Sequence, residues 1–177
     1  MEEKIVVIIN GQGGVGKDTI CEILSRHYRV TNVSSIDPIK EIARAHGWQG
    51  EKDPKARKFL ADLKRAFVAY NDLPNVYLKE KYAAFLEDAQ GQILFVHIRE
   101  ADQIDAFKRS VGIRCVTLLV RGRSRGALGN LSDDETGAYA YDYYYDNTGS
   151  LERLEGDVVR FFGGVLGWSG AGLPPCL

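Results

Sequence analysis

The sequence predicts an α/β fold in which five strands alternate with helices around a mainly parallel sheet. Two observations support this prediction. Short apolar runs rich in β-branched residues recur along the chain, the first at 5–9, and they are too short for helices. Segments with apolar residues at helical spacing separate these runs. The 177 residues are enough for one such domain.

The first half of the chain is expected to contain two strands and four helices. The strands cover 5–9 and 29–35, with a glycine-rich loop and a helix over 17–28 between them. Asp37 and Pro38 are good residues to start the next helix, which should end near His46. Further helices should begin at Pro54 and Pro74. Two successive helices without a strand between them indicate a helical insert.

The second half returns to alternation. Strands are expected at 92–98, 113–120 and 142–145, and helices at 101–110 and 150–162. We therefore expect one domain over 1–163, with a long connection at about 121–141. The Gly- and Pro-rich tail, 164–177, should be peripheral.

Composition excludes several classes of protein. The formal charge is −1, so no broad basic surface is available to bind polymeric nucleic acid, and any anion site must be local. The three cysteines are far apart and form no C-x-x-C pair, so they predict neither disulfides nor a zinc site, and a cytoplasmic location is the simplest expectation. The amino terminus does not look like a signal peptide, and no apolar stretch is long enough to cross a membrane.

The strongest chemical signal is the segment GQGGVGKDT at 11–19, which fits the pattern G-x-x-x-x-G-K. Glycines let such a loop wrap a polyphosphate so closely that its backbone N–H groups point inward, and the following helix adds a favourable dipole. An ordinary glycine-rich turn is the alternative, but the strand-loop-helix context favours phosphate binding. The predicted nucleotide-binding residues here are Gly11, Gly13, Gly14, Val15, Gly16, Lys17, Asp18 and Thr19.

Asp18 occupies the place that a Ser or Thr usually holds in this pattern. That hydroxyl normally contributes an oxygen to Mg²⁺. A carboxylate can bind the ion directly or through water. The sequence therefore predicts ATP and Mg²⁺ as cofactors, with Asp18 as the metal ligand.

The Gly-Lys-Asp-Thr form of the loop resembles that of bacteriophage-type deoxynucleoside monophosphate kinases, within the nucleoside monophosphate kinase-like branch of P-loop proteins. Segments 36–41 and 98–103 resemble the family's acceptor-site segments, and 142–154 is similar to a closing strand, turn and helix shared with dephospho-coenzyme A kinases. The resemblance implies a three-layer P-loop NTPase sandwich with strand order 2-3-1-4-5, a helical acceptor-site insert and a lid.

The resemblance also implies a reaction, the transfer of the γ-phosphoryl group of ATP to a small phosphorylated acceptor such as a nucleoside or deoxynucleoside monophosphate. Asn147 and its turn would contact the adenine edge. The residues expected to face the acceptor are Asp37, Lys40, Arg99 and Glu100. The catalytic set is Lys17, Arg99, Arg121 and Arg123.

His97 departs from the family's pattern, which has an acid at this position. Its imidazole could pack under the loop or take part in the site, and Glu100 or Asp37 could replace the missing charge. Arg57 and Lys64 share one flank of a helix, so both could line an acceptor cleft or form a solvated surface.

The connection at about 121–141 starts with three arginines, at 121, 123 and 125, and is longer than an inert connection usually is. We interpret it as a lid whose guanidinium groups neutralise transition-state charge. A plain basic loop is the alternative. The tyrosines at 139, 141 and 143–145 are expected to be strand and core residues rather than a base-stacking platform.

Two other functions remain open on the sequence. One is a kinase for a different metabolite, such as phosphomevalonate or dephospho-coenzyme A. The other is a nucleotide-binding switch without transfer activity, which the absence of an acid at position 97 would explain.

Overall fold

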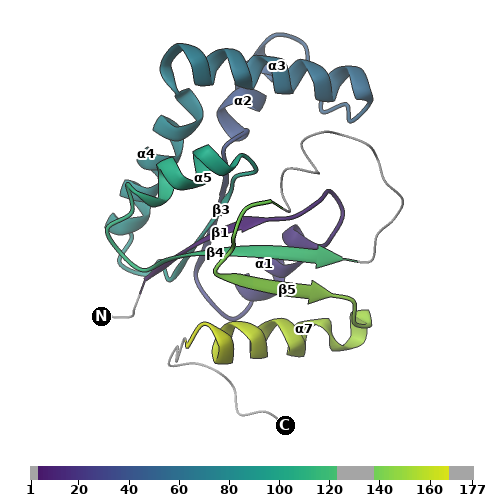
Figure 1. Ribbon diagram of the computed structural model, residues 1–177, viewed down its shortest axis with the longest axis vertical. Coiled ribbons are helices and arrows are strands. Elements are labelled where there is room, and N and C mark those ends of the chain that lie inside the picture. The colour runs from purple at the N-terminus through teal and green to yellow at the C-terminus, as the bar shows by residue number, and fades with distance from the viewer. Residues whose placement is uncertain (1–3, 123–137, 168–177) are drawn as a thin grey trace.

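The computed structural model describes residues 4–122 and 138–167, and its centre is one parallel sheet. The strands are β1 (Ile5–Asn10), β2 (Val30–Ser34), β3 (Ile93–His97), β4 (Cys115–Gly122) and β5 (Tyr143–Asn147). Their order across the sheet is β2-β3-β1-β4-β5, which confirms the predicted topology. Every neighbouring pair runs parallel, so all five carboxyl ends lie at one edge (Figure 1).

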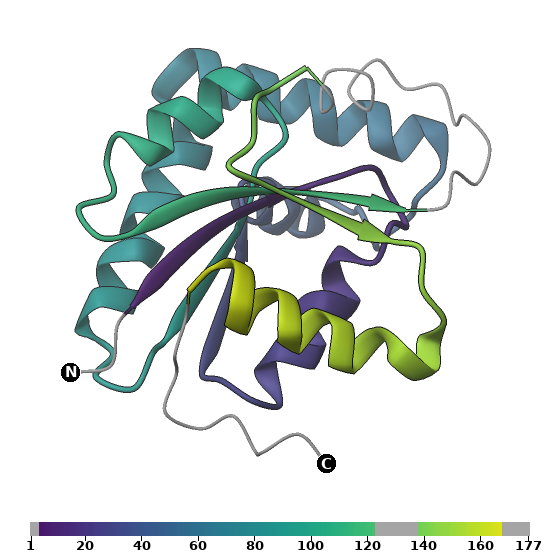
Figure 2. The ribbon, with the colours of Figure 1, turned by 60° about the horizontal axis from the view of Figure 1, so that its bottom comes forward.

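Helices cover both faces of the sheet. Helix α1 (Lys17–Ser25) packs beside α7 (Leu151–Arg160) on one face, and α4 (Leu73–Glu87) and α5 (Ala101–Lys108) lie on the other (Figure 2). The central strand β1 is buried along its whole length, because it has helices on both sides. This explains the uninterrupted apolar run at its start.

The two helices of the expected insert differ in position: α4 packs on the sheet, whereas the helix that starts at Pro54 packs with the helix before it in a small cluster at the top of the molecule in Figure 1. Helices α2 (Asp37–Ala45) and α3 (Pro54–Asn71) bury Ile39, Ala43 and Leu60 against each other. The start of α3 is fixed by Asp53, whose Oδ1 accepts the Ala56 N–H at 2.8 Å. This cluster thus stands above the sheet edge where the strands end.

The predicted boundaries hold to within a few residues, with one correction in the tail. A π-helical segment, Phe161–Val165, continues α7, and Leu166 after it is only 2% exposed within the core cluster on the α1 face. The Leu166 carbonyl also accepts a hydrogen bond from Arg114. The first residues of the tail therefore belong to the core, because the apolar side chain of Leu166 packs into this cluster. Residues 168–177 lie outside the described part.

The tyrosines near β5 differ in how far they are buried. Tyr141 is 6% exposed, and the rings of Tyr143 and Tyr145 pack edge-on against Phe161. Tyr144 is 44% exposed. None of the helices within 4–122 and 138–167 has the length and hydropathy of a membrane span.

Candidate phosphoryl-transfer site

The glycine loop joins β1 to α1 and depends on glycine at two positions of close approach. Gly11 has φ +148°, and a Cβ there would lie 2.4 Å from the Val120 carbonyl oxygen. Gly16 has φ +97°, and a Cβ there would lie 2.4 Å from Asn147 Nδ2. Side chains at either place would clash and force an unfavourable backbone. The loop can therefore hold its tight curve only with these glycines.

Lys17 begins α1, and its ammonium group lies over the loop. Its Nζ donates to the carbonyl oxygens of Gly11 at 2.6 Å and Gln12 at 2.8 Å. Asp18 and Thr19 follow in the first turn of α1 and are exposed. Gly16 gives the helix no side-chain cap. A cation and the N–H groups of a helix start thus gather at one place, which is a good arrangement for phosphate groups.

Asn147, at the end of β5, contacts this loop through its side chain. Its Nδ2 donates to the Val15 carbonyl oxygen at 2.9 Å. The side chain therefore shapes the loop, a role that sequence reasoning missed. Its expected contact with adenine stays a prediction.

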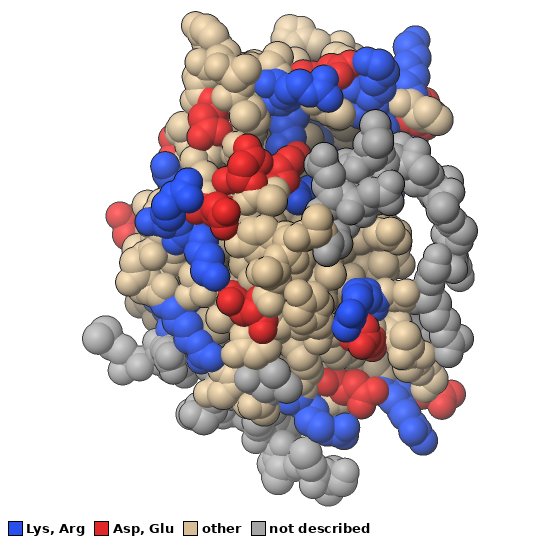
Figure 3. All heavy atoms as spheres, in the orientation of Figure 1, with Lys and Arg blue, Asp and Glu red and all other residues tan. Residues whose placement is uncertain are grey.

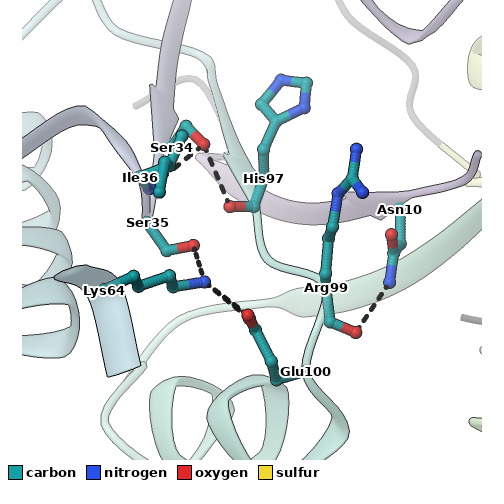
Figure 4. Close-up of polar contacts among 8 residues, drawn as sticks. All are labelled: Asn10, Ser34, Ser35, Ile36, Lys64, His97, Arg99 and Glu100. Atoms are coloured by element: carbon teal, nitrogen blue, oxygen red, sulfur yellow. Dashed lines mark hydrogen bonds and ion pairs between the residues drawn. The ribbon is translucent and has the colours of Figure 1, made fainter. Parts of the chain in front are cut away.

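The end of β3 brings the acceptor-side residues to the same sheet edge. The register pairs Ile9 with His97, so the residues after both strands leave the sheet side by side. The side chains of His97 and Arg99 point to the same side in Figure 4, and Arg99 is exposed. Arg99 thus lies where open α/β sheets bind ligands.

Glu100 lies where the sequence placed it, but its carboxylate is already engaged. Lys64 Nζ contacts both carboxylate oxygens at 2.7 Å and donates to Ser35 Oγ at 3.0 Å (Figure 4). Burial alone would raise the pKa of Glu100. The charge and hydrogen bond of Lys64, with the backbone N–H groups of Glu100 and Arg99, outweigh burial and lower the pKa.

This arrangement bears on two expectations about charged residues. The Glu100 carboxylate is already paired with Lys64, so its proposed role in place of the acid missing at position 97 would be shared with that ion pair. Lys64 itself is 8% exposed, so it does not belong to a solvated flank, whereas Arg57 is exposed on α3. The helical spacing put both on one flank, but only the contact with the end of β3 distinguishes the two.

His97 is the last residue of β3, and charges from the glycine loop, α2 and Arg99 influence its pKa. Its pKa is lowered to about 4, chiefly by burial, which outweighs the attraction of Asp18, and the charges of Lys17, Lys40 and Arg99 lower it further. Nε2 lies 2.7 Å from Asn32 Oδ1, an acceptor that the Nε2–H tautomer of the neutral ring can reach. The ring is therefore neutral at pH 7 and contributes no negative charge to the site.

The same electrostatic effects show which predicted residues the fold brings together. Lys17 and Asp18 come from the start of α1, Lys40 from α2 and Arg99 from the end of β3, and all four act on His97. Asp37 is nearby but occupied, because its Oδ2 accepts the Ser34 N–H at 2.7 Å. Its charge and that of Glu41 add to burial in raising the pKa of Tyr77 on α4.

Arg121 lies near the end of β4 and interacts with β5. Its Nε is 2.8 Å from Asp146 Oδ1, and its guanidinium carbon is 5.0 Å from the centre of the Tyr144 ring. Arg123, Arg125 and most of the predicted lid lie outside the described residues.

The magnesium prediction can be tested against the donor set. Within residues 4–122 and 138–167, no group of three His, Cys, Asp or Glu side chains is arranged to hold a metal ion. Mg²⁺ that accompanies a nucleotide usually needs only one or two carboxylates, because phosphates and water complete its shell. The single exposed carboxylate of Asp18 beside the loop fits that requirement.

No protein-family profile matches the chain, but relatives are found by sequence and by structure. Adenylate kinase isoenzyme 1 of Cyprinus carpio is 26% identical over 158 residues, covering 83% of this chain and 78% of that protein. The chain is thus similar in sequence to a nucleoside monophosphate kinase over most of its length. The bacteriophage-type subfamily is a finer assignment than this relative gives.

Solved structures share the fold of this P-loop protein at low sequence identity. A candidate kinase of Chloroflexus aurantiacus matches with a TM-score of 0.55 and 12% identity, over 96% of this chain and 100% of that one. The tunicamycin resistance protein of Deinococcus radiodurans gives 0.53 and 15%, over 98% and 100%. The Mycobacterium tuberculosis APS kinase bound to AMPPNP and APS gives 0.51 and 13%, over 93% and 100%. These structures show that the chain has the P-loop NTPase fold.

Proposed function

We propose that this protein transfers the γ-phosphoryl group of ATP to a nucleoside or deoxynucleoside monophosphate. The observation that carries the proposal is geometric: the glycine loop with Lys17 follows β1, Arg99 follows the neighbouring strand β3, and both strands end at the same edge of the sheet. The similarity to an adenylate kinase adds independent support.

The donor phosphates would bind in the loop at 11–16. Backbone N–H groups supply the geometry, and Lys17 moves its ammonium from the loop carbonyls to phosphate oxygens. Mg²⁺ bound with the nucleotide supplies further neutralising charge, and Asp18 would hold it directly or through water. Thr19 would contact adjacent oxygens.

The acceptor phosphate would bind to Arg99, whose planar guanidinium can hold two oxygens at once. Lys40 would add a second cation, and the predicted role of Arg57 would be at the rim of the cleft. Since the attacking phosphate oxygen is already anionic, no protein nucleophile is needed, and catalysis consists of positioning and charge stabilisation. Arg121 would leave Asp146 and engage the phosphates in the closed state.

Acceptor identity can be decided by an enzyme assay. Purified protein, ATP and Mg²⁺ are incubated with each common ribo- and deoxyribonucleoside monophosphate, with phosphomevalonate and with dephospho-coenzyme A. ADP formation and the phosphorylated product are both measured, and Lys17→Ala serves as the inactive control. We expect a nucleoside diphosphate from at least one monophosphate.

Other outcomes of this assay contradict the proposal in distinct ways. A product only from phosphomevalonate or dephospho-coenzyme A would assign a different acceptor to the same donor site. ATP binding by calorimetry without ADP formation from any acceptor would identify a nucleotide-binding switch.

A further inference from the structure

Asn10 is a buried polar residue at the end of an otherwise apolar strand. It closes β1 and is only 1% exposed. A buried amide is costly unless it is hydrogen-bonded, and this one has three contacts. Its Oδ1 accepts the Gly11 N–H at 2.8 Å, and its Nδ2 donates to Tyr141 Oη at 2.8 Å and to the Arg99 carbonyl oxygen at 3.2 Å.

These partners fix the orientation of the amide. The Gly11 N–H can only donate, so it must face the oxygen, and the Arg99 carbonyl can only accept, so it must face the nitrogen. Reversing the amide would break both contacts. The side chain is therefore an oriented bridge.

The bridge lies beyond the last rung of the β1–β3 ladder. The register ends at Ile9 and His97, and after these residues the two chains part to form the glycine loop and the Arg99 segment. Figure 4 shows the Asn10 amide reaching across to the Arg99 carbonyl. On the other side of β3, the Ser35 N–H donates to the His97 carbonyl oxygen at 3.0 Å. The end of β3 is thus held from both sides.

Tyr141 extends the bridge towards β4 and β5. Its hydroxyl oxygen accepts from Asn10, and its backbone N–H donates to Tyr144 Oη at 3.2 Å. The Tyr144 ring in turn lies under the Arg121 guanidinium. Contacts therefore run from the glycine loop through Asn10 to a predicted catalytic arginine.

We propose that Asn10 is a positioning residue that sets the separation between the phosphate-binding loop and Arg99. The inference rests on the proposed function, because it concerns the alignment of donor and acceptor phosphates. Misplacement by about 1 Å can cost about 100-fold in rate. Asn10 touches no reacting atom in this scheme and acts through the backbone at Gly11 and Arg99.

The decisive variant is Asn10→Asp. A carboxylate can still accept from the Gly11 N–H and from the Tyr141 hydroxyl, but it has no N–H for the Arg99 carbonyl. We expect kcat to fall about 10–100-fold while the KM for ATP changes less than about threefold. The kcat of Asn10→Ala, which removes all three contacts, should fall by at least the same factor.

Tyr141→Phe and Tyr82→Phe form a matched pair of controls. Each removes one hydroxyl from a buried tyrosine, but the Tyr82 hydroxyl accepts from Gly112 away from the site. Tyr82→Phe should leave kcat unchanged whatever it does to the melting temperature. Tyr141→Phe should have an effect between those of Tyr82→Phe and Asn10→Asp, since it leaves the Gly11 and Arg99 contacts in place.

A second readout does not need an acceptor. AMPPNP should slow amide hydrogen exchange in a peptide covering 97–101 of the wild-type protein, and this protection should be lost in Asn10→Asp at saturating AMPPNP. An unchanged kcat and intact protection in a folded Asn10→Asp would overturn the positioning role. Absence of wild-type transfer to any monophosphate would instead contradict the proposed function, and the exchange measurement would still test the bridge.

Discussion

The proposed donor side and the proposed acceptor side of the site are built in opposite ways. The donor side consists of nine consecutive residues, and its geometry comes from backbone and glycine. The acceptor side consists of side chains from α2, α3 and the end of β3, held by an ion pair between residues 36 positions apart. Side chains of Lys and Arg also gather over α3 at the top of Figure 3. The donor site is therefore local in sequence, whereas the acceptor site exists only after folding.

Lys17→Ala should have the largest effect and should affect catalysis rather than folding. Removing one preorganised charge from a transition state typically costs about 10²–10³ in rate, so we expect kcat/KM for ATP to fall by roughly that factor. Calorimetry should show a large loss of affinity for ATP and little for adenosine. Lys58→Ala, an exposed lysine on α3, is the control. Equal losses for ATP and adenosine would show that the loop does not bind phosphate.

Lys64→Met should have the converse effect, a loss of stability. The side chain of Lys64 is 11% exposed, and without it the Glu100 carboxylate would be left half-buried and unpaired. We expect a loss of about 2 kcal/mol in the free energy of unfolding, measured by urea denaturation. Lys58→Met breaks the exposed pair with Asp62 on the same helix and should change little. If both variants lost the same free energy of unfolding, the Lys64–Glu100 pair would contribute no more to stability than the exposed Lys58–Asp62 pair.

This pair also gives a pH dependence of known sign. Because folding lowers the pKa of Glu100, its contribution is fully present above the usual carboxyl pKa of about 4.3 and is lost as the pH falls through the folded value. Urea denaturation from pH 7 to pH 3 should therefore show a shallower loss of stability in Glu100→Gln. A wild-type slope in that variant would contradict this contribution.

Arg99→Lys tests the acceptor side without removing charge. A lysine cannot make a bidentate contact with a phosphate, so the KM for the acceptor should rise about tenfold with a smaller change in kcat. Arg121→Ala should do the reverse, because a contact made only on closure stabilises the transition state more than the ground state. Arg160→Ala, on the exposed face of α7, is the control. Wild-type kinetics for Arg99→Lys would show that the acceptor binds elsewhere.

Asp18 should have a smaller effect, visible in the magnesium dependence. Asp18→Ala should raise the magnesium concentration at half-maximal activity several-fold, and Asp18→Ser should recover part of the change through a hydroxyl ligand. Activity is measured against magnesium concentration at fixed ATP. If both variants follow the wild-type curve, Asp18 acts only as an acidic residue at a helix start.

The smallest expected effect concerns His97, whose ring should not titrate in the range that is usual for histidine. With its pKa lowered to about 4, the ring should stay neutral between pH 8 and pH 5.5, where an ordinary histidine would titrate near 6.5. Protonation of His97 at lower pH opposes folding, since the unfolded chain binds that proton more readily. An NMR titration, with the resonance assigned by His97→Gln, measures this directly. A midpoint near 6.5 would mean that the ring is solvated.

The sequence by itself predicted the proposed donor loop and determined the order of elements. Both depend on residues that are neighbours in the chain: apolar periodicity, the helix starts at Asp37 and Pro54, and glycines whose spacing permits one loop shape. The topology also followed, through a family resemblance that the sheet order confirmed. Asn10 could have been noticed as a polar residue ending a buried strand, but its partners could not.

Tertiary structure alone decided which charges are available to a substrate. Arg57 and Lys64 are equivalent in helical periodicity, yet Lys64 turns inward to Glu100 and Arg57 stays exposed. Asn147 contacts the glycine loop from 132 residues away, Leu166 enters the core from a tail of glycines, and Asn10 reaches Arg99 across two strand ends. In each case the contact depends on distances set by sheet packing, and for Lys64, Asn147 and Asn10 the cost of burying an unpaired polar group also favours it. Neither quantity is encoded in the spacing of residues along the chain.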